Sequence, residues 1–573
     1  MKSLIKIFFI LLILFATFSV QSDVFAKADE ERYTKDNISN YFLGLVAAKE
    51  NNAEKAYSHL KKIEKLKNKH TDFNTDFIRT LVLVENFEEA FDFSKRVWKK
   101  NIFFFEADLL LGINFFINKD YNNAEKHFLR LNKISRSNLI FDEFVGNVLI
   151  AWSKAEQGKE EASFNSLNKI PKSYKNLQNI QNSFLKCFFD SKDTQYSFEN
   201  LIKDKNYNFS RYNFFLTNYY LFKNEIKKAK DLIRKSRTKH SSNLLIKQTD
   251  YLLSKNKFKK VKSFYNCKNP KDSIAEFFYI IANIYSNEKE YELSNFYLKI
   301  SYYLNKDFLA NQTLLAENYY YQKKYQYSKK IYKTIKSLGQ VYSWHATKKI
   351  ATILIDEKGK DYAAKLLQKE FNSLPNPDFE NYYQLANFYK NNKYFEESIK
   401  YYSSVLKILN KDHILIPKVL ERRGTSYERI GDWKNAEKDL SKSLEILPDQ
   451  AHVLNYLAYT WIDKGINLDE GLKMLKKANS LRVDDGYITD SLGWAYYVKK
   501  NYIEAEIYLQ KAVELLPYDP IINDHYADTL WMLNKNIQAR YIWGNILKIE
   551  DAEEELKNSI NNKLIFGITK NYN

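Results

Sequence analysis

Two segments of the chain repeat one order of small, aromatic and apolar positions. They are residues 422–448, RRGTSYERIGDWKNAEKDLSKSLEILP, and residues 490–517, DSLGWAYYVKKNYIEAEIYLQKAVELLP. The small residues and the closing proline fall at equal offsets in both: Gly424, Ala436 and Pro448 in the first, and Gly493, Ala505 and Pro517 in the second. Because two helices approach closely only where side chains are small, each segment is predicted to be a pair of antiparallel helices that meet at these positions.

The small residue early in the second helix of each pair, which we call the marker, recurs along most of the chain. Successive markers keep one constant spacing within four groups: Ala56, Ala90 and Ala124; Ser294 and Ser328; Ala364 and Ser398; and Gly471, Ala505 and Ala539. Residues 140–290 follow the pattern less well, with markers expected at Ala162, Ala229 and Val261 and one near Gln195. A single helix pair cannot bury its apolar face, so the pairs are predicted to stack around a continuous core.

This constant period, with its small, aromatic and proline positions, resembles the tetratricopeptide repeat, a helix–turn–helix unit of about 34 residues. The resemblance implies an all-α, right-handed superhelical solenoid of about 14–15 repeats. It divides the chain into N-terminal repeats over 27–139, degenerate repeats over 140–290, middle repeats over 291–411, well-matched C-terminal repeats over 412–549, and a capping helix with a tail over 550–573. Leu556 and Ile560 of the tail are expected to cover the apolar end of the last repeat.

Composition fits a chain of long helices with short links. The 573 residues include 14 Gly and 8 Pro, the residues that turns and phosphate-binding loops require. Hydrophobic residues make up 45% of the chain, which excludes global disorder. The formal net charge is +19 and is carried mainly by Lys. Because nucleic-acid sites rely on the bidentate contacts of Arg, we expect a solvated Lys-rich surface and no nucleic-acid partner.

The N-terminus has the form of a secretory signal peptide. Residues 1–26 read MKSLIKIFFILLILFATFSVQSDVFA, with Lys2 and Lys6 before an apolar stretch over 7–20. Val24 and Ala26 suit a signal-peptidase site. The alternative, a retained membrane anchor, is less favoured because this apolar stretch is short for a membrane span. The mature protein is therefore expected in an exported compartment, the bacterial periplasm, with possible membrane association.

The sequence contains no recognisable catalytic motif. Zinc-binding HExxH, the phosphate-binding glycine loops and the GxSxG elbow are all missing. None of the 8 histidines has another within about five residues, the local spacing of metal-ligand pairs. We therefore expect a non-catalytic protein with no cofactor and no metal, in which the many aromatic residues form core rather than a cofactor-stacking site.

The two cysteines, Cys187 and Cys267, are separated along the chain by more than two repeats. Since the units of a solenoid contact only their neighbours, these residues are expected to be separate buried thiols rather than a disulfide.

The predicted binding surface lies on the first helix of the C-terminal repeats. In tetratricopeptide arrays, positions 2, 5, 9 and 12 of this helix line a concave groove, and we call them the groove positions. In the Ala505 repeat they are Tyr487, Asp490, Trp494 and Tyr497, and the groove positions of the Ala539 repeat keep the same offsets from the marker. The candidate anchors and the polar groups between them are Asn455, Tyr459, Tyr487, Asp490, Trp494, Asp524, Asp528 and Trp531. Aromatic residues beside fixed polar groups are typical of binding hot spots, although packing between helices is an alternative role.

Residues 453–547 permit a narrower resemblance. The order LNYLAY, LDEGLKMLKKA, DDGYITDSLGWAYY and PYDPIINDHYADTLW is similar to a group of exported proteobacterial tetratricopeptide proteins. That group includes envelope lipoproteins that act as adaptors of periplasmic carboxyl-terminal processing proteases. This chain departs from them because it has no lipobox cysteine, which leaves lipid tethering unsupported.

The resulting expectation is a non-catalytic scaffold or adaptor of the cell envelope that binds protein partners, such as a periplasmic protease or an envelope assembly factor. Two alternatives stay open. One is a subunit of an envelope glycan-processing or protease complex, and the other is a basic scaffold that binds anionic lipid surfaces.

Overall fold

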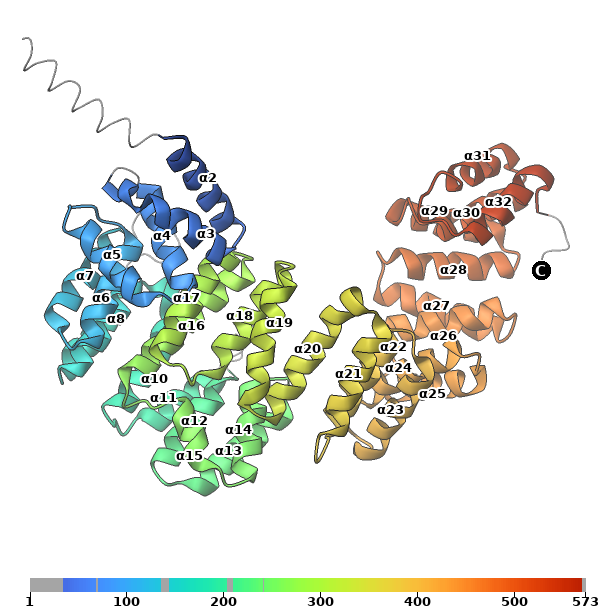
Figure 1. The fold of residues 1–573 in the computed structure, drawn as a ribbon. Coiled ribbons are helices and arrows are strands. Elements are labelled where there is room, and N and C mark those ends of the chain that lie inside the picture. The colour runs from blue at the N-terminus through green and yellow to red at the C-terminus, as the bar shows by residue number, and fades with distance from the viewer. Residues whose placement is uncertain (1–33, 69–70, 135–143, 204–209, 241, 569–573) are drawn as a thin grey trace, which may run out of the picture. The chain divides into compact units, whose positions relative to one another are not determined.

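The computed structural model describes residues 34–68, 71–134, 144–203, 210–240 and 242–568. These residues form 31 α-helices, numbered α2 to α32, and three short 3₁₀ helices, η1 (Lys61–Asn68), η3 (Lys172–Tyr174) and η4 (Lys336–Leu338). No strand occurs in the described ranges. Figure 1 shows the helices joined by short turns, as predicted for an all-α chain.

The chain forms two compact units, divided between Glu357 and Lys358. The helices of unit 1 are α2 (Lys35–Lys49), α3 (Ala53–Leu60), α4 (Thr71–Leu83), α5 (Phe87–Trp98), α6 (Phe105–Ile117), α7 (Tyr121–Ile134), α8 (Phe144–Glu156), α9 (Glu160–Asn168), α10 (Lys175–Phe188), α11 (Thr194–Lys203), α12 (Tyr212–Phe222), α13 (Ile226–Lys239), α14 (Leu244–Ser254), α15 (Phe258–Phe264), α16 (Pro270–Asn287), α17 (Tyr291–Leu304), α18 (Leu309–Tyr321), α19 (Tyr325–Ile335) and α20 (Gln340–Lys358), whose last residue lies past the division.

The helices of unit 2 are α21 (Lys360–Asn372), α22 (Phe379–Asn391), α23 (Phe395–Ile408), α24 (Ile416–Arg429), α25 (Trp433–Ile446), α26 (Ala451–Asp463), α27 (Leu468–Leu481), α28 (Gly486–Val498), α29 (Tyr502–Leu515), α30 (Pro520–Met532), α31 (Asn536–Ile546) and α32 (Glu554–Phe566). In chain order, the thirty helices from α2 to α31 make fifteen pairs, in agreement with the predicted number of repeats. We call the first helix of each pair helix A and the second helix B. The division between the units falls inside the group of middle repeats predicted over 291–411.

Glycines confirm the predicted meeting point of helices A and B. A Cβ atom on Gly493 would lie 2.6 Å from Cγ of Leu509, sixteen residues later in the partner helix. The same offset separates Gly44 from Leu60, Gly112 from Phe128 and Gly424 from Leu440, where the added Cβ would lie 2.5, 2.3 and 3.0 Å from the partner side chain. Any larger residue at these positions would force the two helices apart.

The markers on helix B are buried where the two helices meet, with three shifts from the expected positions. Ala229, Val261, Ser294 and Ala505 are completely buried. In α9 the buried residue is Ser163 rather than Ala162, in α11 it is Thr194 rather than Gln195, and in α21 Ala363 is more deeply buried than Ala364. The helix pairs therefore continue through the degenerate segment, where the sequence pattern is displaced by one residue in α9 and α11 and keeps its position at Ala229 and Val261.

The short turns between helices explain how the chain forms so many with few glycines. Within the described ranges, thirteen non-glycine residues have positive φ angles, most of them Asn or Lys at the turn from helix A to helix B. Lys500 and Asn534 are two examples, at φ 61° and 60° and one repeat apart. Asn tolerates this left-handed conformation best among residues with a side chain.

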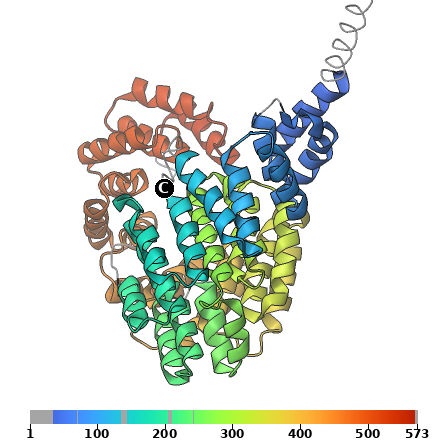
Figure 2. The same cartoon turned by 90° about the vertical axis from the view of Figure 1, so that its left-hand side faces the viewer.

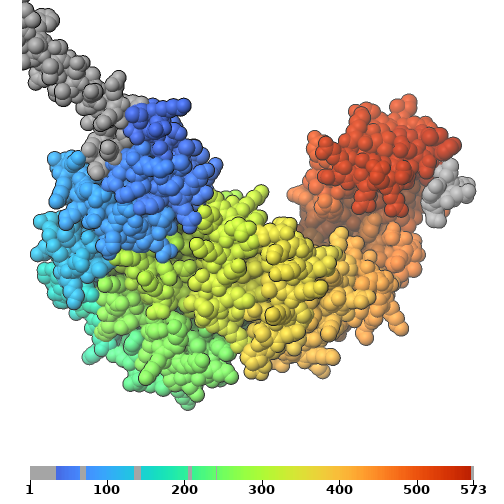
Figure 3. All heavy atoms as spheres, in the orientation of Figure 1, coloured from blue at the N-terminus to red at the C-terminus, as the bar shows by residue number. Residues whose placement is uncertain are grey.

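Unit 1 contains contacts that the prediction of nearest-neighbour stacking did not anticipate. Helix α17 packs against α4, and α16 packs against both α8 and α10. The ring of Phe87 stacks on that of Tyr303 with centroids 4.1 Å apart, and Lys299 forms an ion pair with Glu85. Figures 1 and 2 show helices α16 and α17 beside the N-terminal helices, and the space-filling view in Figure 3 shows their surfaces in contact.

The prediction that Cys187 and Cys267 are separate thiols is wrong, because helices far apart in the sequence are in contact in unit 1. Cys187 and Cys267 form a disulfide, with Cα atoms 5.9 Å apart. Cys187 lies in α10 and Cys267 lies just before α16, and these two helices are in contact across unit 1. Residues far apart along the array therefore meet because unit 1 folds back on itself.

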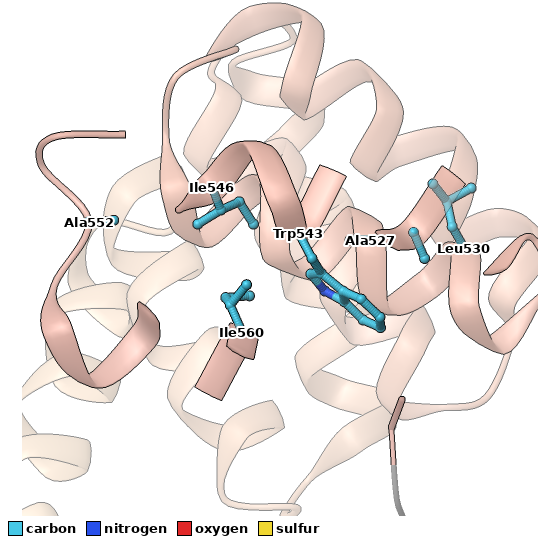
Figure 4. Close-up of a cluster of buried hydrophobic side chains, with 7 residues drawn as sticks. Ala527, Leu530, Trp543, Ile546, Ala552 and Ile560 are labelled. Carbon is cyan, nitrogen blue, oxygen red and sulfur yellow. The ribbon is translucent and has the colours of Figure 1, made fainter. Parts of the chain in front are cut away.

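Helix α32 covers the last helix pair of unit 2. Ile560 is completely buried in a cluster with Ala527, Trp543 and Ile546, and Leu556 packs against this cluster. Figure 4 shows Ile560 below Ile546 and beside Trp543. The described helices include none that is both long and apolar enough to span a membrane.

Candidate functional site

The eight predicted surface residues come from three consecutive A helices of unit 2. Helix α26 carries Asn455 and Tyr459, α28 carries Tyr487, Asp490 and Trp494, and α30 carries Asp524, Asp528 and Trp531. Tyr487 is 60% exposed, whereas the three carboxylates are buried. The exposure expected for Asp490 is therefore wrong, since 6% of this residue is accessible.

His525, from the next helix A, covers the carboxylate of Asp490. Its Nδ1 atom bonds both carboxylate oxygens of Asp490, at 3.0 and 3.1 Å. Trp494 lies flat against the His525 ring, with centroids 4.0 Å apart, and Tyr497 stacks on Trp494 at 4.5 Å. Burial alone would lower the pKa of His525, but Asp490 and the two nearby aspartates raise it above its usual value. Asp490 and Trp494 thus hold an internal histidine in place.

Asp524 and Asp528 bind a lysine of the same chain. Lys563, from α32, lies 2.7 and 2.8 Å from the two oxygens of Asp524 and 2.8 Å from each oxygen of Asp528. The indole N–H of Trp543 also donates to both carboxylates at 3.1 Å. Burial, followed by the charge of Asp524, raises the pKa of Asp528 to about 7. The capping helix therefore supplies a cation that binds both acids.

Trp531 is also largely engaged within the chain. Its ring lies 5.5 Å from that of Trp543, and the guanidinium of Arg540 lies 5.0 Å from its centroid. Gly567 packs so closely on the indole that an added Cβ would lie 2.0 Å from Cζ2.

Two residues of the predicted surface, Tyr487 and Asn455, are not fully engaged in contacts within the described chain. Tyr487 remains accessible at the edge of a depression of about 470 Å³. Asn455 has a buried Oδ1 atom that has no hydrogen-bond partner in the described part of the chain. Next to it in α26, burial and then the charge of Asp490 raise the pKa of Tyr459 to about 12, so this hydroxyl stays protonated.

A cavity in unit 1 was not predicted. It has a volume of about 670 Å³ and is lined mainly by residues of the A helices α14, α16, α18 and α20 and their flanking turns, with Ser210 and Arg211 just before α12. Tyr291, the first residue of α17, is the contribution of a B helix. The lining includes four tyrosines and many Asn, Ser and Thr side chains: Tyr279, Tyr291, Tyr321, Tyr342, Ser210, Ser242, Asn243, Asn283, Ser286, Asn287 and Thr313.

The cavity coincides with the groove positions of five consecutive repeats. Counting back from marker Ser294 by the offsets of the Ala505 repeat gives Tyr279, Asn283 and Ser286, and counting back from Ser328 gives Ala310, Thr313 and Glu317. Arg211, Asn243 and His345 occupy the first groove position before Ala229, Val261 and Ala363. The rule applied to the C-terminal repeats would have found this surface if it had been applied to the markers in the middle of the chain.

Buried charges give the cavity a defined chemistry. Arg211 donates to Glu276 at 2.9 Å, and its guanidinium lies 4.2 Å from the centroid of Tyr279. Burial raises the pKa of Glu276 to about 7, and Arg211 acts in the opposite direction. The Nε atom of Arg211 and the Nε2 atom of His345 are buried and have no hydrogen-bond partner among the described residues.

His345 is held neutral. Burial, followed by the charges of Lys348, Lys349 and Lys247, lowers its pKa to about 3. The nearest carboxylate oxygen, Oε1 of Glu317, is 3.9 Å from its Nε2 atom and is also paired with Lys349 at 3.4 Å. A neutral imidazole, amides, hydroxyls and tyrosine rings bind a polar chain through hydrogen bonds and flat apolar contact.

Metal binding has no support within the described ranges. They contain no group of three or more His, Cys, Asp or Glu residues arranged to hold a metal ion.

Comparisons with known proteins identify the repeat. Residues 379–410, which span α22 and α23, match the family model of the tetratricopeptide repeat. The chain is 31% identical over 165 residues to the TPR repeat-containing protein PA4667 of Pseudomonas aeruginosa. The aligned part is 29% of this chain and 27% of that protein, so the likeness spans about a quarter of the relative.

Solved structures of the same kind resemble parts of the chain. A tetratricopeptide repeat protein from Parabacteroides merdae is 19% identical, has a TM-score of 0.33, and covers 39% of this chain and 86% of its own. MamA from Desulfovibrio magneticus RS-1 is 16% identical, has a TM-score of 0.28, and covers 32% of this chain and 99% of its own. The family match shows that the chain contains a tetratricopeptide repeat at residues 379–410, and the sequence relative is a protein with such repeats.

Proposed function

We propose that the protein is a non-catalytic scaffold that binds a segment of a partner protein in the unit 1 cavity. The observation that carries this proposal is the coincidence of the cavity with the groove positions of five consecutive repeats. Tetratricopeptide proteins act through such surfaces, and hydrogen-bonding side chains between tyrosines suit an extended polypeptide. Binding two partners on one array would raise their local concentration without any bond chemistry.

We further propose that the scaffold works in an exported compartment of a bacterial cell envelope. The signal-peptide pattern of residues 1–26 supports export. The Cys187–Cys267 disulfide supports it independently, because disulfides persist in oxidising compartments. Sequencing the N-terminus of the protein from its native host tests cleavage, and an intact Met1 would contradict it.

The likeness of residues 453–547 to exported adaptors of carboxyl-terminal processing proteases favours one partner class, a periplasmic protease. An envelope assembly factor is the other candidate. The adaptor role requires that the scaffold and the protease co-purify and that substrate cleavage slows when the scaffold is removed.

Site-specific photo-crosslinking tests the location of the binding surface. A photoreactive phenylalanine analogue replaces Tyr321, which lines the cavity, or Tyr362, which does not. These tyrosines are 60% and 48% exposed, so reactivity should be similar. We expect a crosslink to one partner polypeptide at Tyr321 and none at Tyr362.

Calorimetry with the identified partner then tests the cavity itself. Thr313→Arg fills the cavity, whereas an Arg at Tyr362 leaves it open. We expect affinity to fall at least about tenfold in the first variant only. Equal affinity in both variants would reject the cavity, and a crosslink to lipid alone would favour the anionic-surface alternative.

A further inference from the structure

The last two B helices expose an apolar stripe that the preceding B helix does not have. Ile503 and Ile507 of α29 are 67% and 61% exposed, and Ile537 and Tyr541 of α31 are 88% and 72% exposed. The two pairs occupy equivalent positions of successive repeats. One repeat earlier, in α27, these positions hold Asp469 and Lys473. We call this exposed face of α29 and α31 the terminal face. It comprises Ile503, Ile507, Gln510, Glu514, Ile537, Tyr541, Gly544 and Lys548.

Gly544 is a glycine at a helical position where the fold does not require one. It lies on α31 one turn after Tyr541, and a Cβ atom added to it would meet no atom of the described residues within 4 Å. Its φ angle is not in the positive range that favours glycine. Glycine inside a helix is unfavourable compared with alanine. Because no described residue approaches Gly544, its absence of a side chain suits a close approach by another molecule.

The terminal face is complementary to itself. On α29, Ile503, Ile507, Gln510 and Glu514 follow one another along a single side of the helix. The equivalent residues on and just after α31 are Ile537, Tyr541, Gly544 and Lys548. Each stripe is apolar at its start, and the two stripes end in opposite charges at equivalent positions.

Helices α29 and α31 run in the same direction, because each packs against α30 between them. A two-fold axis parallel to the helices and midway between them places α29 of one copy against α31 of the other. Ile503 then faces Ile537 of the second copy, and Ile507 faces Tyr541. Gln510 faces the gap at Gly544, and Glu514 faces Lys548. The symmetry repeats all four contacts in reverse.

We propose that the terminal face is a two-fold interface between two copies of this chain. Charge complementarity favours a second copy as the occupant, since the Glu514–Lys548 pair forms twice in this arrangement and no like charges oppose each other within the stripes. The formal net charge of +19 opposes association in general. The dimer therefore depends on this local match and is favoured at physiological salt over low salt.

Sedimentation equilibrium of the purified protein tests the interface, with circular dichroism melts as the control for folding. We expect a dimer for the wild type and a monomer for Ile537→Asp, with unchanged melting. Ile414→Asp is the matched control, because Ile414 is 89% exposed in unit 2 but lies outside the terminal face. A wild type that stays monomeric at its highest soluble concentration overturns the proposal, as does equal dissociation by both substitutions.

Charge exchange tests the orientation of the two copies. Glu514→Lys and Lys548→Glu should each weaken the dimer at least about tenfold, because two attractive contacts become repulsive. The double variant restores both contacts and should dimerise like the wild type. A double variant as weak as the single ones rejects this two-fold arrangement. Gly544→Leu should also dissociate the dimer while leaving the fold intact, and a fully dimeric Gly544→Leu protein overturns the close approach.

Discussion

Groove positions of the two units differ in whether side chains of the same chain occupy them. In unit 1 they line a cavity of about 670 Å³, where Arg211 and His345 have buried nitrogen atoms without hydrogen-bond partners among the residues that the structure describes. In unit 2 the carboxylates at these positions are occupied by the chain itself, Asp490 by His525 and Asp524 with Asp528 by Lys563. Residue type at a groove position therefore does not decide whether the position is open to a ligand. The decision depends on which side chains of neighbouring helices reach it.

The largest expected effect comes from breaking the occupied site of unit 2. Lys563→Met leaves Asp524 and Asp528 buried without their cation. We expect unit 2 to lose about 3–5 kcal/mol of stability, the cost of an uncompensated buried charge. Hydrogen exchange of α30 and α32 measures the loss locally. Lys557→Met on the same helix removes only a peripheral 3.8 Å contact with Glu554 and is the matched control.

A rescue variant separates charge from packing. Lys563→Met combined with Asp528→Asn removes one of the two negative charges and should recover part of the stability. If Lys563→Met exchanges no faster than Lys557→Met, the ion pairs do not hold α32 on the last repeat.

The second prediction concerns the contact that closes unit 1. Replacing Cys187 and Cys267 together with Ser removes a disulfide across 80 residues and should cost about 2–4 kcal/mol. Thermal unfolding of unit 1, followed by hydrogen exchange, measures the change. A reductant should destabilise the wild type and leave the double variant unaffected, and a wild type indifferent to reductant would contradict the expected contribution.

The sequence was sufficient for the fold because the fold depends on local steric requirements. Gly493 must be small where Leu509 crosses it, and the same requirement recurs at Gly44, Gly112 and Gly424. Such a contact lies within one helix pair, sixteen residues apart, so its spacing is visible in the sequence. In the degenerate segment the marker moves by one residue, from Ala162 to Ser163, and the pattern weakens although the helices persist.

The state of the binding surface could not be read in the same way. Lys563 reaches Asp524 from 39 residues away, in a helix outside the repeat pattern. His525 does not occupy a groove position, yet it covers Asp490 from the next helix A. The Cys187–Cys267 contact depends on unit 1 folding back on itself, which a rule of nearest neighbours excludes. These contacts depend on how helices of different repeats pack in three dimensions. They therefore produce no periodic pattern in the sequence.

The third prediction contrasts one residue from each surface. Asp490→Ala removes the partner of buried His525 and should cost about 1–3 kcal/mol. Thr313→Ala, at the equivalent position beside the cavity, removes only a 3.2 Å bond to the Leu309 carbonyl and should change stability by about 0.5 kcal/mol or less. Denaturant unfolding of each unit provides the comparison. Equal losses would mean that the two surfaces are built alike.

The smallest expected effect is a pH dependence of opposite sign at the two histidines. For His525 the folded pKa is raised, so its contribution to stability is fully present below the unfolded value of about 6.5 and is lost as pH rises through the folded pKa. For His345 the folded pKa is lowered to about 3, so its contribution is present above pH ~6.5 and declines as pH falls toward 3. At pH ~6 the His345 contribution should already be about 1 kcal/mol smaller than at pH ~8. Stability measured for the wild type minus that of His525→Gln, and likewise minus that of His345→Gln, isolates each group from the other titrating residues. Profiles that slope in the same direction would show that the two histidines share one environment, and the contrast between the filled surface of unit 2 and the cavity of unit 1 would no longer hold at these residues.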